Sequence, residues 1–579
     1  MSACSTPSNG GSPQGGAAGL GGKEANAGGA SAAGGATPGQ GGTTGGSATT
    51  SAGASGTGAA SSGGATSVAG GASSNGGTTS NGGTTSNGGT TSNGGTTSNG
   101  GTTSSGGTTS NGGTTSNGGT TSNGGTTPTG SDARYDAIYS GSPWYDDQGN
   151  IINAHSAGVL KDNGKYYLFG ERHSDSSNAF TAFNCYSSSD LINWKFESQA
   201  LSIQSSGILG PNRVGERAKV MKSPSGEYVM FMHTDNLTYT DEAVGYATAT
   251  SVTGPYAFKG ALLYNSSKIA RWDMGTFQDG DGKGYVLLNG GDIYQLATDY
   301  HGASSLVASS VATGGESPAL FKAGSTYFFL FSSRTSWERN DNFYYTASAL
   351  SGPWTSRGKF APSGTLTWNS QTTFVLPVTG SSATTYLFMG DRWAYPRQGT
   401  AATYVWQPLT ASGTTLSVPT FYEAWRIDPN TGSFSEVKAG GTSIDDNAIG
   451  TGINQFGYGG SWTRTTESRS ASAGATASIR FTGTRIKLYG VGNTDGGYAT
   501  LTLVDANNAT IASATLDFYS KYRDVSNELK YVSPLLSNGT YTLKISVVGD
   551  HSTWSDKSGT VYGSTGNYVS IDRAVVTSP

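Results

Sequence analysis

Pairs of apolar runs separated by a tight turn recur along the chain between Ala154 and Asp391. The clearest pair lies in Gly314–Ser333, where a turn at Lys322–Ser325 joins two predicted strands. Its second run, Tyr327–Phe331, is apolar or aromatic at every position, as in a strand buried on both faces. The other four pairs begin at Ala154, Glu216, Trp272 and Ser370. Because no segment has helical spacing, the pattern predicts an all-β fold, and a sheet unit repeated five times is typical of a five-bladed β-propeller.

One polar position recurs in the five units, just before the first apolar run. It is occupied by His155, Glu216, Asp273, Glu316 and Gln371. In a propeller the first strand of each blade lines the central channel, so equivalent positions in successive blades converge on the axis. We therefore expect five polar side chains, three of them acidic, to meet at one end of the channel.

Crowded carboxylates raise one another's pKa, and a carboxyl that is protonated at neutral pH can act as a general acid. Glycoside hydrolysis needs such a group to protonate the leaving oxygen, and a second group to handle water. Four aromatic residues could stack on a sugar ring: Trp272, Trp337, Trp393 and Tyr395. A single acidic residue at a strand end is more often a turn or ion-pair group, but matched positions in a repeat argue against that reading. His155 and His233 lack the spacing of a metal site with two histidines and an acid, so no metal and no cofactor is expected.

Five short motifs, in this order along the chain, resemble those of glycoside hydrolase family 43. They are Thr181–Trp194, Glu216–Val220, Glu316–Pro318, Trp368–Gln371 and Gly390–Trp393. The resemblance covers about Tyr135–Ser435 and is greatest to the exo-β-1,3-galactanase branch. It implies a five-bladed propeller and an inverting enzyme that releases galactose from the β-1,3 backbone of arabinogalactans.

The resemblance also implies roles for particular residues. Glu316 would be the general acid, and Asp273 would tune its pKa and orient it. The base aspartate of most family members is missing where Asn153–Ala157 stands. As in the galactanase branch, Gln371 would hold the attacking water instead, with Glu171 nearby to supply negative charge, and an inverting site would separate Gln371 from Glu316 by roughly 6.5–9.5 Å. Further candidate substrate contacts are His155, Glu216, Asp235, Trp337, Asp391 and Trp393.

Some alternatives remain open. Gln371 could contact a substrate hydroxyl rather than water. Trp272 stands where well-studied family members have an arginine, and Gly290–Tyr294 differs from the galactanase branch. Another family 43 activity, such as that of an α-L-arabinofuranosidase, is therefore an alternative. A catalytically inactive, sugar-binding propeller is a third, because the usual base is absent.

Residues 1–130 hold almost no large apolar side chains, and Ser74–Thr127 consists of nine hexads of the type Ser-Asn-Gly-Gly-Thr-Thr, one of them a variant. Such a sequence cannot bury enough apolar area to offset its ordering entropy, so it predicts a disordered linker. Met1–Cys4 is similar to the end of a bacterial lipoprotein signal without its apolar region. We expect a secreted or outer-surface protein with Cys4 as a candidate lipid anchor; the alternative is an unanchored linker in which Cys4 is free. Cys4 and Cys185 lie in different regions and are poor candidates for a disulfide.

These features divide the chain into a linker (1–130), a catalytic propeller (131–440) and a C-terminal module (441–579). The last alternates apolar and polar residues like a β-sandwich and resembles the galactose-binding-like modules of bacterial glycosidases. Its candidate sugar-stacking residues are Trp462, Tyr489, Tyr519 and Trp554, with core packing as the alternative for each. The net charge of −4 argues against a nucleic-acid partner, and no apolar run is long enough to cross a membrane. The expected partner is a polysaccharide or oligosaccharide, bound by a monomer.

Overall fold

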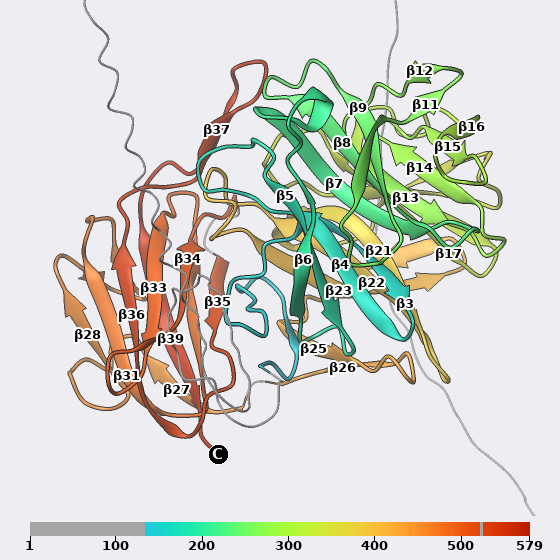
Figure 1. Ribbon diagram of the computed structural model, residues 1–579. Helices are drawn as coiled ribbons and strands as arrows, with labels where there is room; N and C mark the ends of the chain where they lie inside the picture. The colour runs from blue at the N-terminus through green and yellow to red at the C-terminus, as the bar shows by residue number, and fades with distance from the viewer. Residues whose placement is uncertain (1–133, 439, 522–524) are drawn as a thin grey trace, which may run out of the picture. The chain divides into compact units, whose positions relative to one another are not determined.

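The computed structural model describes residues 134–438, 440–521 and 525–579 (Figure 1). The predicted linker (1–130) and Cys4 lie outside the described residues. Apart from two short helical turns, the regular elements of the described residues are all β-strands, as predicted from the repeat of apolar runs. No helix among the described residues is long and apolar enough to span a membrane.

Five four-stranded antiparallel sheets follow one another along the chain, each with its strands in sequence order. The first two are β3 (His155–Asp162), β4 (Lys165–Glu171), β5 (Ala182–Ser188) and β6 (Lys195–Ser202), then β7 (Arg213–Lys222), β8 (Tyr228–Asn236), β9 (Ala243–Ala249) and β10 (Ala257–Ala261). The third is β13 (Met274–Gln278), β14 (Gly284–Leu288), β15 (Ile293–Leu296) and β16 (Ala303–Ala308). The last two are β17 (Gly315–Ala323), β18 (Thr326–Ser333), β19 (Phe343–Ala347) and β20 (Thr355–Lys359), then β21 (Gln371–Thr379), β22 (Thr384–Arg392), β23 (Thr403–Ser412) and β24 (Thr415–Ser417).

The first strands of the five sheets pack against one another in a ring. β3 contacts β7, β7 contacts β13, β13 contacts β17, β17 contacts β21, and β21 contacts β3. The backbones approach closely at Gly275, where a Cβ atom would lie 2.2 Å from the carbonyl oxygen of Pro318. Only a glycine fits there without a shift of the main chain. The starts of these strands therefore come together, which brings the recurring polar position of each unit into one region.

Short elements connect or flank these sheets. They are β2 (Ile138–Tyr139), the 3₁₀ turn η3 (Gly207–Leu209), β11 (Leu263–Tyr264), β12 (Ser267–Lys268), α2 (Leu366–Asn369), β25 (Ala424–Ile427) and β26 (Phe434–Glu436). β2, β25 and β26 form a three-stranded sheet, so the start of the described chain pairs with residues near Trp425.

The C-terminal part contains two further antiparallel sheets. One consists of β27 (Thr442–Asp445), β29 (Thr463–Arg464), β30 (Ser468–Ser470), β32 (Arg485–Gly492), β35 (Val525–Val532) and β39 (Val569–Thr577). The other consists of β28 (Gln455–Gly459), β31 (Thr476–Gly483), β33 (Tyr498–Val504), β34 (Thr510–Asp517) and β36 (Gly539–Val547). Residues of both sheets, among them Ile479, Leu501 and Ile571, form one buried apolar cluster. A separate hairpin, β37 (Thr553–Ser555) and β38 (Val561–Gly563), extends from these sheets.

Candidate active site

Four of the five recurring polar residues occupy the same place in their sheets, opposite a residue near the end of the second strand. The pairs are His155 with Glu171, Glu216 with His233, Glu316 with Ser332, and Gln371 with Asp391. In each strand a bulge soon follows, and it turns the chain sharply. Asp273 differs, because it precedes β13 and itself has a positive φ of 41°. Asp273 therefore is similar to the other four residues in its number of positions before the second strand, but not in its place in the sheet. Its carboxylate still reaches the same cluster.

Glu316 is the partly exposed carboxyl of the cluster. Burial raises its pKa well above the usual value, and the negative charge of Asp273 raises it further, while Arg217 and Arg334 oppose the shift. The net effect favours the protonated form of this carboxyl. This is the state that a general acid needs before it donates a proton.

Asp273 is buried, and its carboxylate accepts hydrogen bonds from three donors. Its Oδ1 accepts from Nε of Arg217 at 2.7 Å, and its Oδ2 accepts from the backbone N–H of Ser317 at 2.9 Å and from that residue's hydroxyl at 3.0 Å. Ser317 directly follows Glu316. The same interactions therefore fix the negative charge of Asp273 and the start of the strand that carries the acid.

Gln371 is held at both ends of its amide. Its Oε1 accepts from Arg217 at 2.9 Å and from Nε1 of Trp393 at 2.9 Å, both of which can only donate. Its Nε2 donates to the Ser332 hydroxyl at 3.0 Å and to Glu316 Oε1 at 3.2 Å. The expected separation of roughly 6.5–9.5 Å between this amide and the acid is therefore wrong. The two groups touch because Gln371 begins β21, whose neighbour in the ring is β17, which carries Glu316.

Glu171 is buried and has a partner at each oxygen. Oε1 accepts from the backbone N–H of Arg217 at 2.7 Å, and Oε2 lies 2.6 Å from Nε2 of His173. Burial opposes the charge on Glu171, but His173 outweighs it and lowers the pKa of this carboxyl. Burial likewise opposes the charge on His173, yet Glu171 raises its pKa. Glu171 therefore supplies negative charge beside Arg217, with one partner at each of its oxygens.

Glu216 belongs to a second buried group of charges. Its Oε2 lies 3.0 Å from Nδ1 of His233, whose Nε2 lies 3.2 Å from Asp235, and its Oε1 accepts from Tyr239 at 2.6 Å. Burial opposes the positive charge of His233, but the carboxylates of Asp235 and Glu216 raise the pKa of this histidine to about 9. Glu216, His233 and Asp273 also lie close enough together to hold a metal ion. A ring that is protonated between two carboxylates suits an ion pair rather than a metal ligand, so these residues do not fit a metal well.

His155 and Asp391 contact each other beside the cluster. His155 Nδ1 lies 3.1 Å from Asp391 Oδ1, and Asp391 Oδ2 accepts from the backbone N–H of Ser156 at 2.9 Å. The His155 ring stacks on Tyr404, with the ring centroids 4.7 Å apart. Both His155 and Asp391 are buried. As with Asp235, a direct contact with substrate stays a prediction for both.

The aromatic candidates differ in how much of their ring surface is exposed. Trp393 is buried and donates to Gln371. Trp337 is half-buried and packs edge-on against Trp393, with the ring centroids 5.1 Å apart. Trp337 also stacks on Tyr395 at 5.7 Å. Trp272 is half-buried beside Asp273 and carries the guanidinium of Arg334 at 4.8 Å from its ring centroid. Trp337, Tyr395 and Trp272 are thus the rings with exposed surface for a sugar.

The sequence of residues 153–317 matches the model of the family described as "Glycosyl hydrolases family 43". The chain is 27% identical to an exo-β-1,3-galactanase from Phanerochaete chrysosporium crystallised with galactose, with a TM-score of 0.56 over 76% of this chain and 100% of that one. It is 34% identical to a protein provisionally assigned as an exo-β-1,3-galactanase from Bifidobacterium bifidum s17, over 48% of this chain and 95% of that one, with a TM-score of 0.46. The chain belongs to glycoside hydrolase family 43, and it is a glycosidase.

Two more crystal structures of the Phanerochaete chrysosporium enzyme, in which one glutamate is replaced by alanine or by glutamine, contain β-1,3-galactotriose. They are similar to this family 43 chain to the same extent, with 27% identity and a TM-score of 0.56. None of the curated proteins matches the chain.

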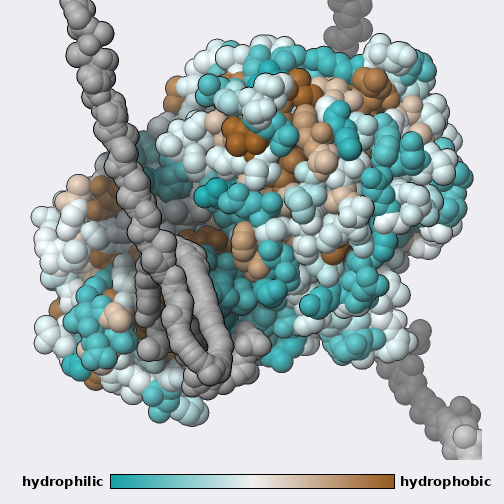
Figure 2. Space-filling model, viewed as in Figure 1, coloured by the Kyte–Doolittle hydropathy of each residue, from teal (hydrophilic) through white to brown (hydrophobic). Residues whose placement is uncertain are grey.

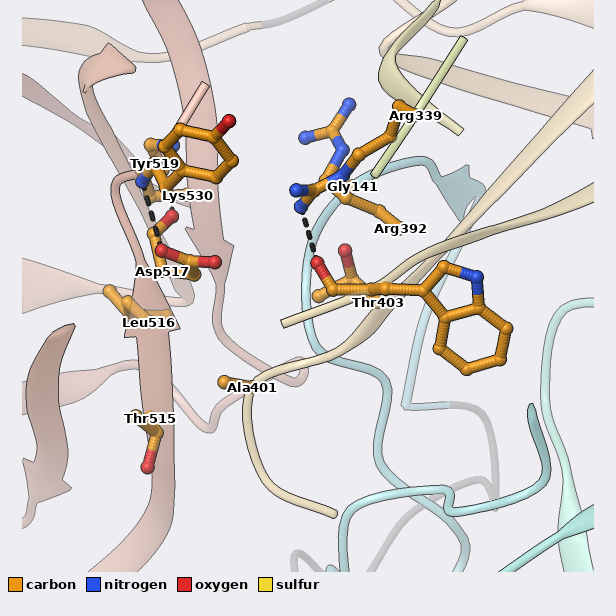
Figure 3. Close-up of a pocket in the computed structure, with 11 residues that line it drawn as sticks. Gly141, Arg339, Arg392, Ala401, Thr403, Thr515, Leu516, Asp517, Tyr519 and Lys530 are labelled. Atoms are coloured by element: carbon orange, nitrogen blue, oxygen red, sulfur yellow. Dashed lines mark hydrogen bonds between the residues drawn. The ribbon is translucent and has the colours of Figure 1, made fainter. Parts of the chain in front are cut away.

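The pocket drawn in Figure 3 lies next to the cluster of this family 43 chain rather than within it. It is bounded on one side by Arg339, Arg392 and Trp393 and on the other by Asp517 and Tyr519 of the C-terminal part. Arg339 donates to the carbonyl oxygen of Trp393. Burial raises the pKa of Asp517. The Arg339 guanidinium also lies 5.4 Å from the ring centroid of Tyr519, so one arginine contacts both the C-terminal part and the main chain of the tryptophan that donates to Gln371.

The C-terminal aromatics are less available than their sequence pattern indicated. Tyr489, Tyr519 and Trp554 are all buried. Tyr519 donates to Glu338 at 2.6 Å, and Tyr489 to Glu423 at 2.7 Å, so both hold the C-terminal part to the preceding sheets. Trp462 is half-buried and packs on Tyr458. Of the four candidates, Trp462 alone keeps a substantially exposed ring for a sugar.

Sequence reasoning missed Arg217, which connects three of the named residues: its backbone contacts Glu171 and its side chain contacts Asp273 and Gln371. It follows Glu216 directly and lies within the motif Glu216–Val220. A positive φ of 59° turns its side chain away from the regular alternation of β7. The motif Glu216–Val220 therefore indicated the site, but the sequence did not show which of its residues contacts the other residues of the site.

Proposed function

We propose that this glycosidase is an exo-acting galactan hydrolase that releases galactose from β-1,3-galactan with inversion. The observation that carries this proposal is the cluster in which Glu316, whose pKa is raised, lies with Asp273 and Gln371 around Arg217. Because an inverting site needs room for water, Gln371 and Glu316 must separate when substrate binds. The similarity to the Phanerochaete chrysosporium exo-β-1,3-galactanase, which spans all of that chain, supports the choice of substrate.

In this proposal Glu316 protonates the leaving oxygen, and Asp273 keeps it protonated and oriented. Gln371 directs Nε2 toward Glu316, so a water molecule or a sugar hydroxyl entering between them would accept from this amide. Because Arg217 and Trp393 both donate to Oε1, that oxygen has no room for a proton, and the imidic-acid form of Gln371 would need one of these contacts to break. Arg217 brings positive charge to the amide, which makes its nitrogen a better donor to a water that enters there. When that water attacks the anomeric carbon, the bond to the leaving oxygen breaks, the leaving oxygen takes the proton of Glu316, and the proton lost by the water passes to solvent.

The proposal extends to the architecture and location. The five sheets with ring-packed first strands fit a five-bladed propeller over 131–440, followed by a sandwich module over 441–579 that assists carbohydrate binding. The preceding 1–130 would be a linker in a monomeric protein that is secreted or held at the outer surface, with Cys4 as the candidate anchor.

A substrate screen tests the function. The full chain is incubated with β-1,3-galactan, arabinan and arabinoxylan, and the released sugars are identified together with their anomeric configuration. Galactose of inverted configuration from β-1,3-galactan alone is the expected product. Arabinose release would instead favour an arabinofuranosidase, and binding without release would favour an inactive sugar-binding protein.

A further inference from the structure

The hairpin of β37 and β38 brings a lysine from the C-terminal part to the edge of the active-site cluster (Figure 1). Nζ of Lys557, in the hairpin loop, donates to the carbonyl oxygen of Tyr239 at 2.5 Å. The same nitrogen lies 5.6 Å from the ring centroid of Tyr239 and 5.9 Å from that of Trp272. The hydroxyl of Tyr239 donates to Glu216, and Trp272 precedes Asp273. Lys557 is therefore linked to the buried carboxylate of Glu216 through Tyr239, and it lies close to the residue that precedes Asp273.

A second cation lies at the same indole ring. The guanidinium carbon of Arg334 is 4.8 Å from the centroid of Trp272, and both Arg334 and Lys557 are exposed. Contacts of this kind between a cation and an aromatic ring hold the charge in place while leaving its other side accessible to solvent. Trp272 thus gathers two cations at one edge of the site.

Neither cation has a carboxylate partner within salt-bridge distance among the described residues. The contrast with a neighbour is direct, because Arg271 lies next to Trp272 in sequence and pairs with Asp292 at 3.2 Å. Two unpaired cations beside a tryptophan offer a binding place for a carboxylate. Arg334 follows Ser332, the residue opposite Glu316 in the β17–β18 pair, by two positions, so this cation lies at the end of the sheet that carries the acid.

We propose that Arg334 and Lys557 form a subsite for a carboxylate on the leaving-group side of the scissile bond, so that the enzyme favours a leaving sugar that is a uronate. The inference rests on the proposed function, because the general acid protonates the leaving oxygen and groups beside it meet the leaving sugar. It also gives the C-terminal part a role in substrate choice through a residue that it contributes itself.

The test compares two disaccharides that differ in one group, β-1,3-galactobiose and β-galactosyl-1,3-galacturonate, at pH 6 and low ionic strength. We expect wild-type kcat/KM to be higher for the uronate, by about two- to fivefold for each cation, as for other exposed charge pairs. Added salt should reduce the preference because it screens exposed charges. In Lys557→Met the ratio of kcat/KM for the uronate to kcat/KM for galactobiose should fall by about two- to fivefold, the contribution expected of one cation. In Lys557→Glu this ratio should fall further.

Lys544→Met is the matched control. Lys544 is an exposed lysine of the same C-terminal part, on β36, and it contacts only Asn508 through its side chain amine among the described residues. This variant should keep the wild-type ratio. A structural role of Lys557 in pinning the hairpin would change both rates together and leave the ratio intact.

Each outcome decides the matter. A wild-type ratio at or below one, or an equal ratio in wild type and Lys557→Met, overturns the uronate subsite while leaving galactan hydrolysis in place. Failure of the wild type to cleave β-1,3-galactobiose overturns the proposed function, and the subsite with it. A ratio above one that falls in both Lys557 variants but not in Lys544→Met supports the subsite.

Discussion

At the scale of single residues, the properties of Glu316 come from its neighbours. Burial and the charge of Asp273 raise its pKa, and Ser317 ties the backbone beside it to that same aspartate. Three donors surround the carboxylate of Asp273, whereas Glu316 accepts from Gln371, so two carboxyls of one cluster lie in different environments.

Glu316→Gln should preserve the fold and the binding of a terminal sugar, because an amide oxygen can still accept from Gln371. Turnover of galactan should fall by about 10²–10⁴, the usual contribution of general acid catalysis. Aryl galactosides with good leaving groups should lose less, because their leaving oxygen needs little protonation. Comparing kcat on the two substrate classes checks this, and equal losses would argue against Glu316 as the acid.

The pH profile gives an independent check of the same group. Glu316 acts only when protonated, and its pKa is raised in the folded protein, so wild-type activity should persist above the ordinary range of glutamate and decline as pH rises through the raised pKa. In Glu316→Gln that decline should disappear from the residual activity. An unchanged alkaline limb would assign it to another residue.

Gln371→Glu tests the contacts of the amide. A carboxylate at this position can still accept from Arg217 and Trp393, but its other oxygen would lie against Glu316. Like charges so close raise a pKa, and the pair would titrate together. We expect a folded variant with reduced turnover and an alkaline limb shifted to higher pH.

Gln371→Ala is the control for that variant. If Gln371 orients water, kcat should fall strongly with little change in KM, because water positioning matters in the transition state. A higher KM with unchanged kcat would instead identify Gln371 as a contact to a sugar hydroxyl. In Gln371→Glu the carboxyl next to the new carboxylate is Glu316, which the Gln371 amide contacts at 3.2 Å in the wild type.

At the scale of strands, the sequence predicted what depends on local pattern. The apolar runs and the turn within Lys322–Ser325 correspond to β17 and β18. The exact strand starts were harder to predict, since β7 begins at Arg213, before the expected Glu216, and β13 begins at Met274, after Asp273. Asp273 has a positive φ, a backbone conformation that sequence spacing does not reveal. The contact of Trp393 with Gln371 depends on rotamers, and the contact of Lys557 with Tyr239 joins residues 318 positions apart. Neither leaves a periodic signal.

Gly275→Ala tests the close packing of the first strands. A Cβ atom would lie 2.2 Å from the carbonyl oxygen of Pro318, which belongs to the main chain and cannot rotate away. β13 and β17 would have to separate, at a cost of about 1–3 kcal/mol, as for other overpacked sites. Because Ser317 and Glu316 lie beside Pro318, activity should fall together with the melting temperature.

Gly280→Ala provides the comparison, since an added Cβ there would meet nothing within 4 Å. It should leave the melting temperature and kcat close to wild type. If Gly275→Ala were equally harmless, the approach of β13 to β17 would be looser than the structure has it.

At the scale of the whole described chain, the C-terminal sheets and the five sheets before them share interactions that a tethered binding module would not need. Tyr145, Ile486 and Tyr531 belong to one apolar cluster, although the first lies before β3 and the others in the C-terminal sheets. Arg392 pairs with Glu528, next to the tryptophan that donates to Gln371. Figure 2 shows that the described surface is largely polar on the face drawn, as expected when large apolar areas are covered by neighbouring parts of the chain.

Removal of residues 441–579 should therefore damage the catalytic part rather than only its affinity for polysaccharide. The shortened chain would expose the apolar side of Tyr145 and leave Glu338 without Tyr519. We therefore expect a lower melting temperature and at least a tenfold loss of kcat/KM even on β-1,3-galactobiose, which is too short to need a separate binding module.

Tyr498→Phe in the full chain is a milder change, because it removes the donor to the carbonyl oxygens of Ala394 and Tyr395 at 2.8 and 3.1 Å while keeping the ring. In calorimetry of the full chain, the C-terminal sheets and the five sheets before them should unfold in one cooperative transition. Two separate transitions, with full disaccharide activity in the shortened chain, would mean that the C-terminal part is an independent module.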